Sequence, residues 1–233
     1  MAERRVTFSI PELKKAAASA TGATECVQII KLPEGLFNRA FLLVMDNGSE
    51  VIARMPTPVA GPAHYVTASE VATMEFMRDL GVPVPKVLAW SSNAENEVGA
   101  EYIIMEKAQG IQLKEVWDVM PSTQKCRFLA DLVSIEAKML STGADSYGAL
   151  YYKGDVPNGK LVRGKEGATK FCIGPSVRRS YWEGVKAGMD IDRGPCKFLN
   201  VLTDERGILR AVSCGIHYAR DKLDVNIRGD QTD

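Results

Sequence analysis

The chain has 233 residues, of which 45% are hydrophobic and 25% are charged, and its 29 basic residues equal its 29 acidic residues. This is the composition of an ordinary globular protein with enough apolar residues to build a sizeable core. Zero net charge excludes bulk electrostatic attraction to nucleic acid or to an anionic membrane, so neither is an expected partner. No apolar run approaches the roughly 18 residues that a membrane-spanning helix needs.

The five cysteines are widely spaced and include no C-x-x-C pair. An odd number at such spacing argues against a disulfide framework and against a zinc site, and it fits a reducing compartment. The first residues lack the apolar stretch of a secretory signal. They have a weakly basic amphipathic pattern, but Glu3 and Glu12 oppose a mitochondrial presequence, which is therefore the minority interpretation.

The chain is predicted to begin with a short helix and three β-strands. The helix is expected at residues 10–18, and the β-prone runs lie at 26–32, 41–45 and 51–55. Asn47 and Gly48 separate the last two runs, and an Asn-Gly pair in that place is among the strongest hairpin signals. These two strands are therefore predicted to be adjacent and antiparallel.

A second helix and two further strands are predicted next. The helix is expected to begin at Thr67 or Ser69 and to end at Gly81, because apolar residues recur at helical spacing between these points. The strands are expected at 86–90 and 101–105, followed by the longest helix at 121–140, a short helix at 180–187 and strand-like pieces between these two helices. This order predicts a five-stranded antiparallel sheet with one packed helix, followed by a more helical lobe.

Three stretches together resemble the aminoglycoside phosphotransferase and choline kinase superfamily. They comprise residues 34–41 with 51–56, 68–74 with 82–87, and 101–106 with Gly110. Two further segments, 60–70 and 173–195, are similar to the fungal "altered inheritance of mitochondria" phosphotransferase-like proteins. The resemblance covers about residues 6–195. It implies an α+β, protein-kinase-like fold with a five-stranded antiparallel N-lobe sheet, one packed helix and a partial, mainly helical C-lobe.

The resemblance also implies a division of the chain and a chemistry. A nucleotide-binding N-lobe is expected at 1–108, a partial C-lobe at 109–195 and an atypical tail at 196–233. The implied reaction is ATP-dependent transfer of phosphate to a hydroxyl of a small molecule, with ATP and Mg²⁺ as cofactors. The partners would then be a nucleotide and an unidentified small-molecule acceptor.

The resemblance assigns nine nucleotide-binding residues by position. They are Gly35, Leu36, Phe37 and Asn38 in a turn over the phosphates, Arg54 on a strand, Glu70 on the following helix, and Met105, Glu106 and Ala108 at the interlobe hinge. Backbone N–H groups of such a turn donate to phosphate oxygens. The hinge would bind adenine through backbone groups, which leave little side-chain signature.

Arg54 stands where related kinases have a phosphate-binding Lys. Its guanidinium is a permanently charged planar fork rather than a point charge, so it can bind phosphate with a different reach. Glu70 is expected to pair with it. Each position also has a plainer explanation, namely an ordinary β-turn, a solvated strand-end Arg, a first-turn Glu favoured by the helix dipole, and a plain connection at the hinge.

The catalytic half of the family pattern is not found. The family's catalytic loop reads His-x-Asp-x-x-x-x-Asn, and a following strand carries a second Asp that holds magnesium. Asp221 and Asn226 match this spacing, but Ala219 replaces the His, so no catalytic or metal residue is assigned. From Cys196 onward the chain no longer resembles the family. We therefore expect an incomplete or mis-spliced gene product.

Two functional interpretations follow. The first is a phosphotransferase-family chain that is inactive when truncated in this way. The alternative is a non-catalytic nucleotide-binding pseudokinase or interaction module linked to mitochondrial maintenance. The resemblance implies a mitochondrial location without a clear transit peptide, with the cytoplasm as the alternative.

Overall fold

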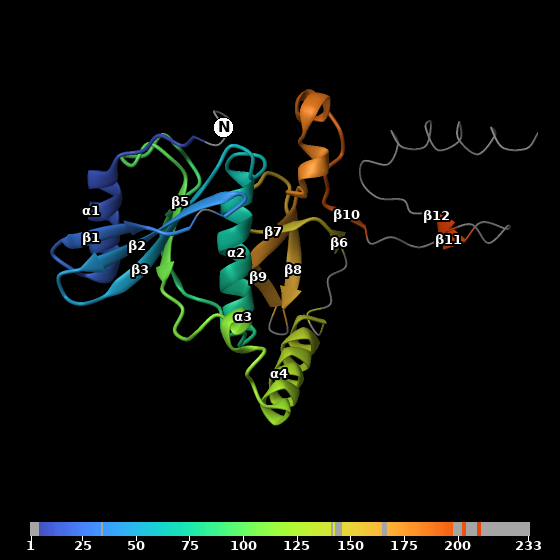
Figure 1. The fold of residues 1–233 in the computed structure, drawn as a ribbon. Helices are drawn as coiled ribbons and strands as arrows, with labels where there is room; N and C mark the ends of the chain where they lie inside the picture. The colour runs from blue at the N-terminus through green and yellow to red at the C-terminus, as the bar shows by residue number, and fades with distance from the viewer. Residues whose placement is uncertain are drawn as a thin grey trace, which may run out of the picture. The chain divides into compact units, whose positions relative to one another are not determined.

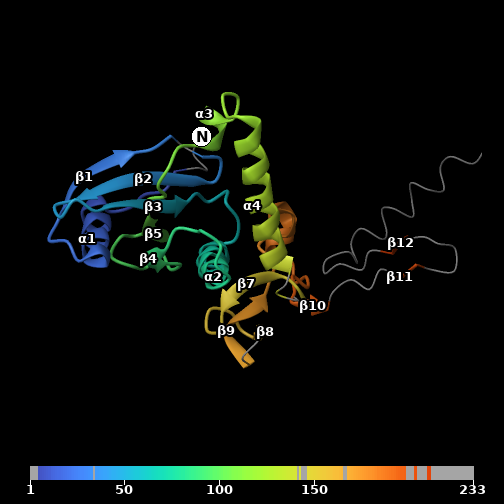
Figure 2. The same ribbon diagram turned by 90° about the horizontal axis from the view of Figure 1, so that it is seen from below.

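A computed structural model describes residues 5–33, 35–140, 142, 146–164, 167–197, 202–203 and 209–210 (Figures 1 and 2). The chain divides into two compact units, Met1–Gly143 and Ala144–Asp233. The lobe boundary expected at residue 108 stays a prediction. Among the described residues, no helix is both long enough and apolar enough to cross a bilayer.

The first unit contains five strands and four helices among its described residues. In chain order they are α1 (Ile10–Thr21), β1 (Cys26–Lys31), β2 (Asn38–Met45), β3 (Glu50–Pro56), α2 (Tyr65–Asp79), β4 (Val87–Ser91), β5 (Tyr102–Glu106), α3 (Leu113–Val116) and α4 (Ser122–Leu140). The strands form one antiparallel sheet in the order β1-β2-β3-β5-β4. The predicted α+β class with a five-stranded antiparallel sheet is therefore confirmed.

The hairpin between β2 and β3 forms where the sequence predicted it. Val44 pairs with Glu50 across the turn, and the pairing continues to Asn38 opposite Pro56. Gly48 has a φ of 80°, which a residue with a side chain rarely adopts, so glycine at this position matches the turn.

Helix α1 is capped at both ends by local residues. The Ser9 hydroxyl accepts a hydrogen bond from the Glu12 backbone N–H at 3.4 Å. Gly22 ends the helix in the left-handed conformation, with a φ of 66°. The helix continues to Thr21, beyond the predicted end at residue 18, because Gly22 is the first residue that supplies this turn.

The main core lies between the sheet and α1. Leu13 of α1, Leu43 of β2 and Ala53 of β3 are all fully buried in it. Side chains alternate between the two faces of a strand, so Arg54 lies on the opposite face from Ala53. On that opposite face α2 packs, in contact with β4 and β5. The sheet thus has a helix on each face, α1 over the core and α2 over Arg54 (Figures 1 and 2).

Helix α2 begins at Tyr65, earlier than either predicted start. Thr67 and Ser69 resemble N-caps in the sequence, but both lie inside the helix and are buried, at 1% and 7% exposure. The N-cap is His64, whose φ is 65°. Its imidazole lies 2.8 Å from the Ser92 hydroxyl and does not cap the helix. The partner that caps this end comes from a distant strand.

Helix α4 matches the predicted longest helix in its bounds. The Lys138 ammonium of α4 donates to the Gly81 carbonyl at 2.9 Å, just after the end of α2. Near its start, the Phe128 ring meets the ring of Trp117 edge-on, with 6.0 Å between centroids. These contacts connect α4 to the rest of the first unit.

The described part of the second unit consists of short strands and 3₁₀ turns. Its elements are β6 (Ser146–Tyr147), β7 (Ala149–Tyr152), β8 (Lys160–Gly164), β9 (Gly167–Gly174), η2 (Arg179–Tyr181), η3 (Gly184–Gly188), β10 (Cys196–Lys197), β11 (Leu202–Thr203) and β12 (Leu209–Arg210). Strands β7, β9 and β8 form an antiparallel sheet in that order. Among the described residues, α-helix in the predicted second lobe is therefore confined to α3 and α4.

Two hydrogen bonds fix the chain that follows β9. The buried Tyr151 donates its hydroxyl to the Pro175 carbonyl at 2.6 Å. The Ser176 N–H donates to the Arg193 carbonyl at 2.7 Å, which joins two stretches far apart in the sequence. The predicted match to a catalytic loop, Asp221 and Asn226, lies outside the described residues.

Candidate functional site

Arg54 and Glu70 form an ion pair on the α2 face of the sheet. Arg54 is on the central strand β3, and Glu70 is in the second turn of α2. Both side chains are about three-quarters buried, with exposures of 28% and 26%. The structure therefore brings together the two charged residues that the sequence singled out, although they are 16 positions apart.

The surroundings of Arg54 on this face are apolar. Arg54 pairs with Ile103 of β5, and Ile52 pairs with Met105. By strand alternation, these side chains share the face of Arg54. Ile103 and Met105 are buried at 2% and 8% exposure, whereas Ile52 is half-buried. This face therefore combines buried apolar side chains with the Arg54 guanidinium.

Residues 35–37 lie in the connection between β1 and β2. Leu36 is 67% exposed, and Asn38 is the first residue of β2. A side chain at Gly35 would meet only the Asn38 carbonyl, at an ordinary 3.5 Å, so this glycine is not required by space. Gly35 therefore carries no conformational signal of phosphate binding, and the phosphate-binding turn stays a prediction.

Thr57 anchors this turn to the end of β3. Its backbone N–H and its hydroxyl both donate to the Phe37 carbonyl, at 2.8 and 3.0 Å. Thr57 is buried, with 5% exposure. The turn is therefore held against the strand that carries Arg54.

Replacing Thr57 by valine is expected to lower the free energy of unfolding by about 1 kcal/mol, because it removes one buried hydroxyl donor and keeps the side-chain shape. Chemical denaturation monitored by circular dichroism checks this. Thr123→Val is the matched control, since Thr123 is exposed on α4 and should change stability by less than about 0.5 kcal/mol. Equal effects of the two substitutions would contradict the anchoring role.

Of the predicted hinge residues, Met105 and Glu106 are the last two residues of β5, and Ala108 follows the strand. Glu106 makes two contacts with Lys86, its N–H donating to the Lys86 carbonyl and its carboxylate accepting from the Lys86 N–H, both at 2.9 Å. The Lys107 ammonium lies 2.6 Å from the Glu50 carboxylate at the start of β3. The side chains of this segment thus fix it to the sheet. Adenine binding by its backbone, including Ala108, stays a prediction.

Glu101 is a residue that the sequence did not assign to the site. One of its carboxylate oxygens accepts from the His64 backbone N–H at 3.0 Å, and the other from the Thr67 hydroxyl at 2.6 Å. Glu101 therefore caps α2 from the residue that precedes β5. The contacts span 37 and 34 positions, so no local pattern could have indicated them.

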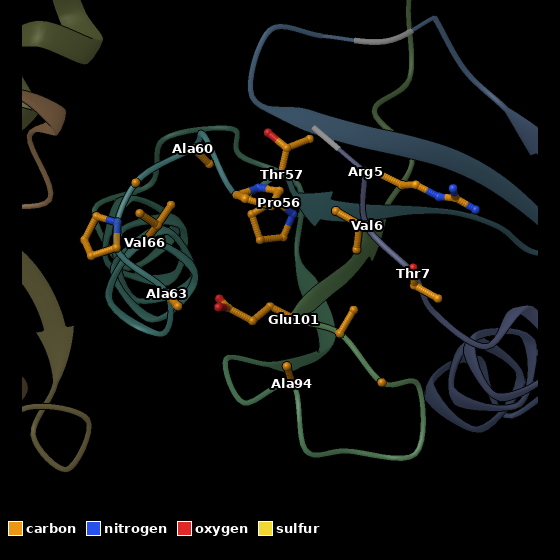
Figure 3. Close-up of a pocket in the computed structure, with 15 residues that line it drawn as sticks. Arg5, Val6, Thr7, Pro56, Thr57, Ala60, Ala63, Val66, Ala94 and Glu101 are labelled. Carbon is orange, nitrogen blue, oxygen red and sulfur yellow. The ribbon is translucent and has the colours of Figure 1, made fainter. Parts of the chain in front are cut away.

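A cavity of about 450 Å³ lies next to Glu101 (Figure 3). The N-terminal segment, the loop after β3 and the loop before β5 line it, and Val6, Pro56 and Val66 give it apolar walls. In Figure 3 the Glu101 carboxylate points toward Ala63 and Val66 at the start of α2. The cavity includes none of the nine residues assigned to nucleotide binding.

The described residues fit a nucleotide better than a metal ion. Arg54 offers a partly exposed guanidinium that Glu70 already orients, which suits a phosphate. Within the described ranges, no three His, Cys, Asp or Glu side chains gather as a metal site would require. No step that involves magnesium can therefore be derived from these residues.

The two buried cysteines, Cys26 and Cys172, are not activated nucleophiles. Burial raises the pKa of the Cys26 thiol and of the Cys172 thiol above the usual value. Both thiols therefore stay protonated at neutral pH, and only the thiolate is reactive. Cys126 is exposed on α4.

No protein-family model matches the chain. It is 45% identical over 173 residues to a subtelomeric hrmA-associated cluster protein of Aspergillus fumigatus, which covers 74% of this chain and 33% of the relative. It is 29% identical over 170 residues to altered inheritance of mitochondria protein 9, mitochondrial, of Debaryomyces hansenii, which covers 66% of this chain and 27% of the relative. The chain is 26% identical over 208 residues to the protein of that name from Yarrowia lipolytica, a match that covers 82% of this chain and 36% of the relative.

Solved structures with a similar arrangement are more distant. A GDP complex of an aminoglycoside 2'-phosphotransferase has 18% identity and a TM-score of 0.44, covering 57% of this chain and 41% of that chain. A ternary complex of an aminoglycoside phosphotransferase with AMP-PNP and hygromycin B has 20% identity and a TM-score of 0.38, covering 58% and 42%.

The chain spans about a third of the length of the curated relatives it matches. The described first unit is an antiparallel five-stranded sheet with an Arg–Glu pair between its central strand and α2. Over this span the chain is similar to the fungal altered inheritance of mitochondria protein 9, with 29% identity to the Debaryomyces hansenii protein and 26% to the Yarrowia lipolytica protein.

Proposed function

We propose that the first unit binds a nucleotide, with ATP as the expected ligand, on the α2 face of its sheet. The observation that carries this proposal is the Arg54–Glu70 ion pair between β3 and α2. The base would lie on the apolar surface near Ile52 and Met105, and the phosphates would meet Arg54 beneath the turn at residues 35–38. In this arrangement Arg54 binds phosphate and Glu70 orients Arg54.

The role that we propose for the pair is orientation of the guanidinium. Because both side chains are about three-quarters buried, the desolvation cost of the two charges offsets much of their attraction. A guanidinium that is already held in place loses less side-chain entropy when a phosphate binds. Glu70 also leaves part of the guanidinium fork available, because an Arg has five N–H donors.

Phosphate transfer to a hydroxyl of a small molecule is proposed only for the longer family members, of which this chain spans about a third. For this chain the proposal is nucleotide binding without turnover. The alternative is a non-catalytic nucleotide-binding pseudokinase or interaction module. Between the longer relatives and such a module, the measurable difference is the release of ADP.

Addition of ATP is expected to stabilise the chain by about 2.7 kcal/mol at a concentration one hundred times the Kd. Thermal unfolding with ATP, with and without magnesium, measures this shift, and a coupled assay measures ADP. Stabilisation without ADP release supports a binding module, whereas magnesium-dependent stabilisation with ADP release supports an enzyme. The absence of any shift with ATP, ADP or GTP would refute nucleotide binding.

We propose a mitochondrial location because relatives such as the Debaryomyces hansenii protein are named as mitochondrial. The chain with a fluorescent protein fused to its C-terminus should co-localise with a mitochondrial marker. An even cytoplasmic distribution would instead favour the alternative location.

A further inference from the structure

We propose that Glu101 is the positioning residue of the nucleotide site: it fixes the first turn of α2 and thereby holds Glu70 against Arg54. This inference rests on the proposed nucleotide function, which it deepens. It concerns how the Arg54–Glu70 pair is kept in place. The argument starts from the N-terminus of α2, the helix that carries Glu70.

Helix α2 lacks the local side-chain features that usually fix a helix start, although its Tyr65 and Val66 N–H groups donate to the Ala63 and Pro62 carbonyls just before it. Its first turn contains no acidic residue, and its N-cap is His64 with a φ of 65° rather than Ser, Thr, Asp or Asn in an extended conformation. The N-terminal N–H groups of a helix nevertheless need acceptors. A carboxylate at this end is also favoured by the helix dipole.

Glu101 supplies that carboxylate from outside the helix. It accepts from the His64 N–H at 3.0 Å and from the Thr67 hydroxyl at 2.6 Å, so each oxygen binds a different part of the first turn. Thr67 is 1% exposed, so its hydroxyl depends on a protein partner. Two bonds to one rigid group fix both the position of the helix end and its rotation.

The rotation matters because Thr67 and Glu70 are three residues apart. Residues at this spacing lie on the same side of a helix, one above the other. A bond that points Thr67 toward the sheet therefore also points Glu70 toward the sheet. Any rotation that broke the Thr67–Glu101 bond would move the Glu70 carboxylate away from Arg54.

Glu101 and Arg54 are also linked through the sheet. Glu101 lies two residues before Ile103, and Ile103 pairs directly with Arg54. Helix α2 is thus attached to the neighbouring strands β5 and β3 at two points, first at Glu101 and one turn later at Arg54. Figure 3 shows the Glu101 side chain reaching from the β5 side toward the start of α2.

A further contact, separate from the two hydrogen bonds of Glu101, also anchors the start of α2. The His64 ring nitrogen Nδ1 lies 2.8 Å from the Ser92 hydroxyl, in the loop that leads from β4 to Glu101. The loop before β5 therefore holds the helix end through both the backbone and the side chain of His64. Positioning of α2 is a property of this loop, not of the helix sequence.

The test is the nucleotide affinity of the full chain with Glu101→Gln, measured by calorimetry with ATP well below the unfolding temperature. The amide keeps the shape but loses one acceptor, so α2 is held in its binding position a smaller fraction of the time and the Kd should rise about three- to tenfold. Glu95→Gln is the matched control, because Glu95 is exposed in the same loop and should leave the Kd unchanged. An unchanged Kd in Glu101→Gln would overturn the proposal.

Two further variants separate positioning from general destabilisation. Thr67→Val removes the other bond and should also weaken binding, whereas Thr67→Ser keeps the hydroxyl and should restore it. In a Glu70→Gln background, Glu101→Gln should have no additional effect on the Kd, because the residue through which it acts is already altered. A full additional loss in that background would show that Glu101 does not act through Glu70.

A ligand-independent measurement distinguishes failure of this inference from failure of the proposed function. The side-chain NMR signal of Arg54, assigned by its loss in Arg54→Lys, should move in Glu101→Gln toward its position in Glu70→Gln. If the wild-type chain does not bind ATP but the signal moves, the nucleotide function fails and the positioning role stands. If the signal does not move, the positioning role fails whatever the chain binds.

Discussion

Replacing Leu43 by alanine is expected to lower the free energy of unfolding of the first unit by about 2–5 kcal/mol. Leu43 is fully buried in the core between the sheet and α1, where Leu13 is also fully buried. It pairs with Ile29 on one side and Val51 on the other, so it is in the middle of the sheet. The loss combines the transfer of buried methyl groups with the cavity left in a packed layer.

The measurement should report on the first unit alone, because the chain divides into two units and a single transition cannot be assumed. Hydrogen exchange of the β2 and β3 amides at increasing urea concentrations measures the free energy of unfolding of the first unit. Leu140→Ala is the matched control, because Leu140 is 84% exposed on α4 and should cost less than about 0.5 kcal/mol. A loss below about 1 kcal/mol for Leu43→Ala would mean that this core is not packed as described.

The elements that the sequence predicted well are those specified by neighbouring residues. Gly48 defines the hairpin because the turn places it at a φ of 80°, and the Asn47 side-chain oxygen accepts from the Ser49 N–H at 2.9 Å. The spacing of apolar residues defines α4 because a helix repeats every 3.6 residues. Such signals need no knowledge of the rest of the chain.

The start of α2 was predicted less well because its determinant is not local. Thr67 has the residue type of an N-cap, yet it is buried inside the helix and donates to Glu101, 34 positions away. A sequence pattern cannot distinguish a hydroxyl that caps its own helix from one that binds another strand. For the same reason the sequence did not indicate Glu101, because a Glu before a strand is an ordinary feature of a sequence.

The charged pair of the site was predictable, but only through the resemblance. Nothing in the local sequence distinguishes Arg54 or Glu70 from other charged residues. Only the resemblance to a family places Arg54 on the central strand and Glu70 on the facing helix. The structure shows that they meet, which the plainer explanation of a solvated strand-end Arg does not require. Which groups bind the base stays a prediction, because backbone recognition leaves no trace in side-chain identity.

Replacing Arg54 by alanine is expected to weaken ATP binding by about 10- to 150-fold, the equivalent of one hydrogen-bonded contact to a charged group worth about 1.5–3 kcal/mol. The free energy of unfolding should also fall, because the substitution leaves the Glu70 carboxylate, about three-quarters buried, without its partner, so binding is compared where each variant is still folded. Arg54→Lys should bind more tightly than Arg54→Ala, since it keeps the charge but loses the fork. Calorimetric titration of ATP into each folded variant measures these differences.

A charge swap separates binding from structure. The double variant Arg54→Glu with Glu70→Arg keeps an ion pair between β3 and α2, so its stability should stay within about 1 kcal/mol of wild type. It places a carboxylate on the strand where the phosphates are expected, and like charges repel, so ATP binding should be lost. If the swapped protein bound ATP as wild type does, Arg54 would be a structural residue, and the nucleotide site would have to lie elsewhere.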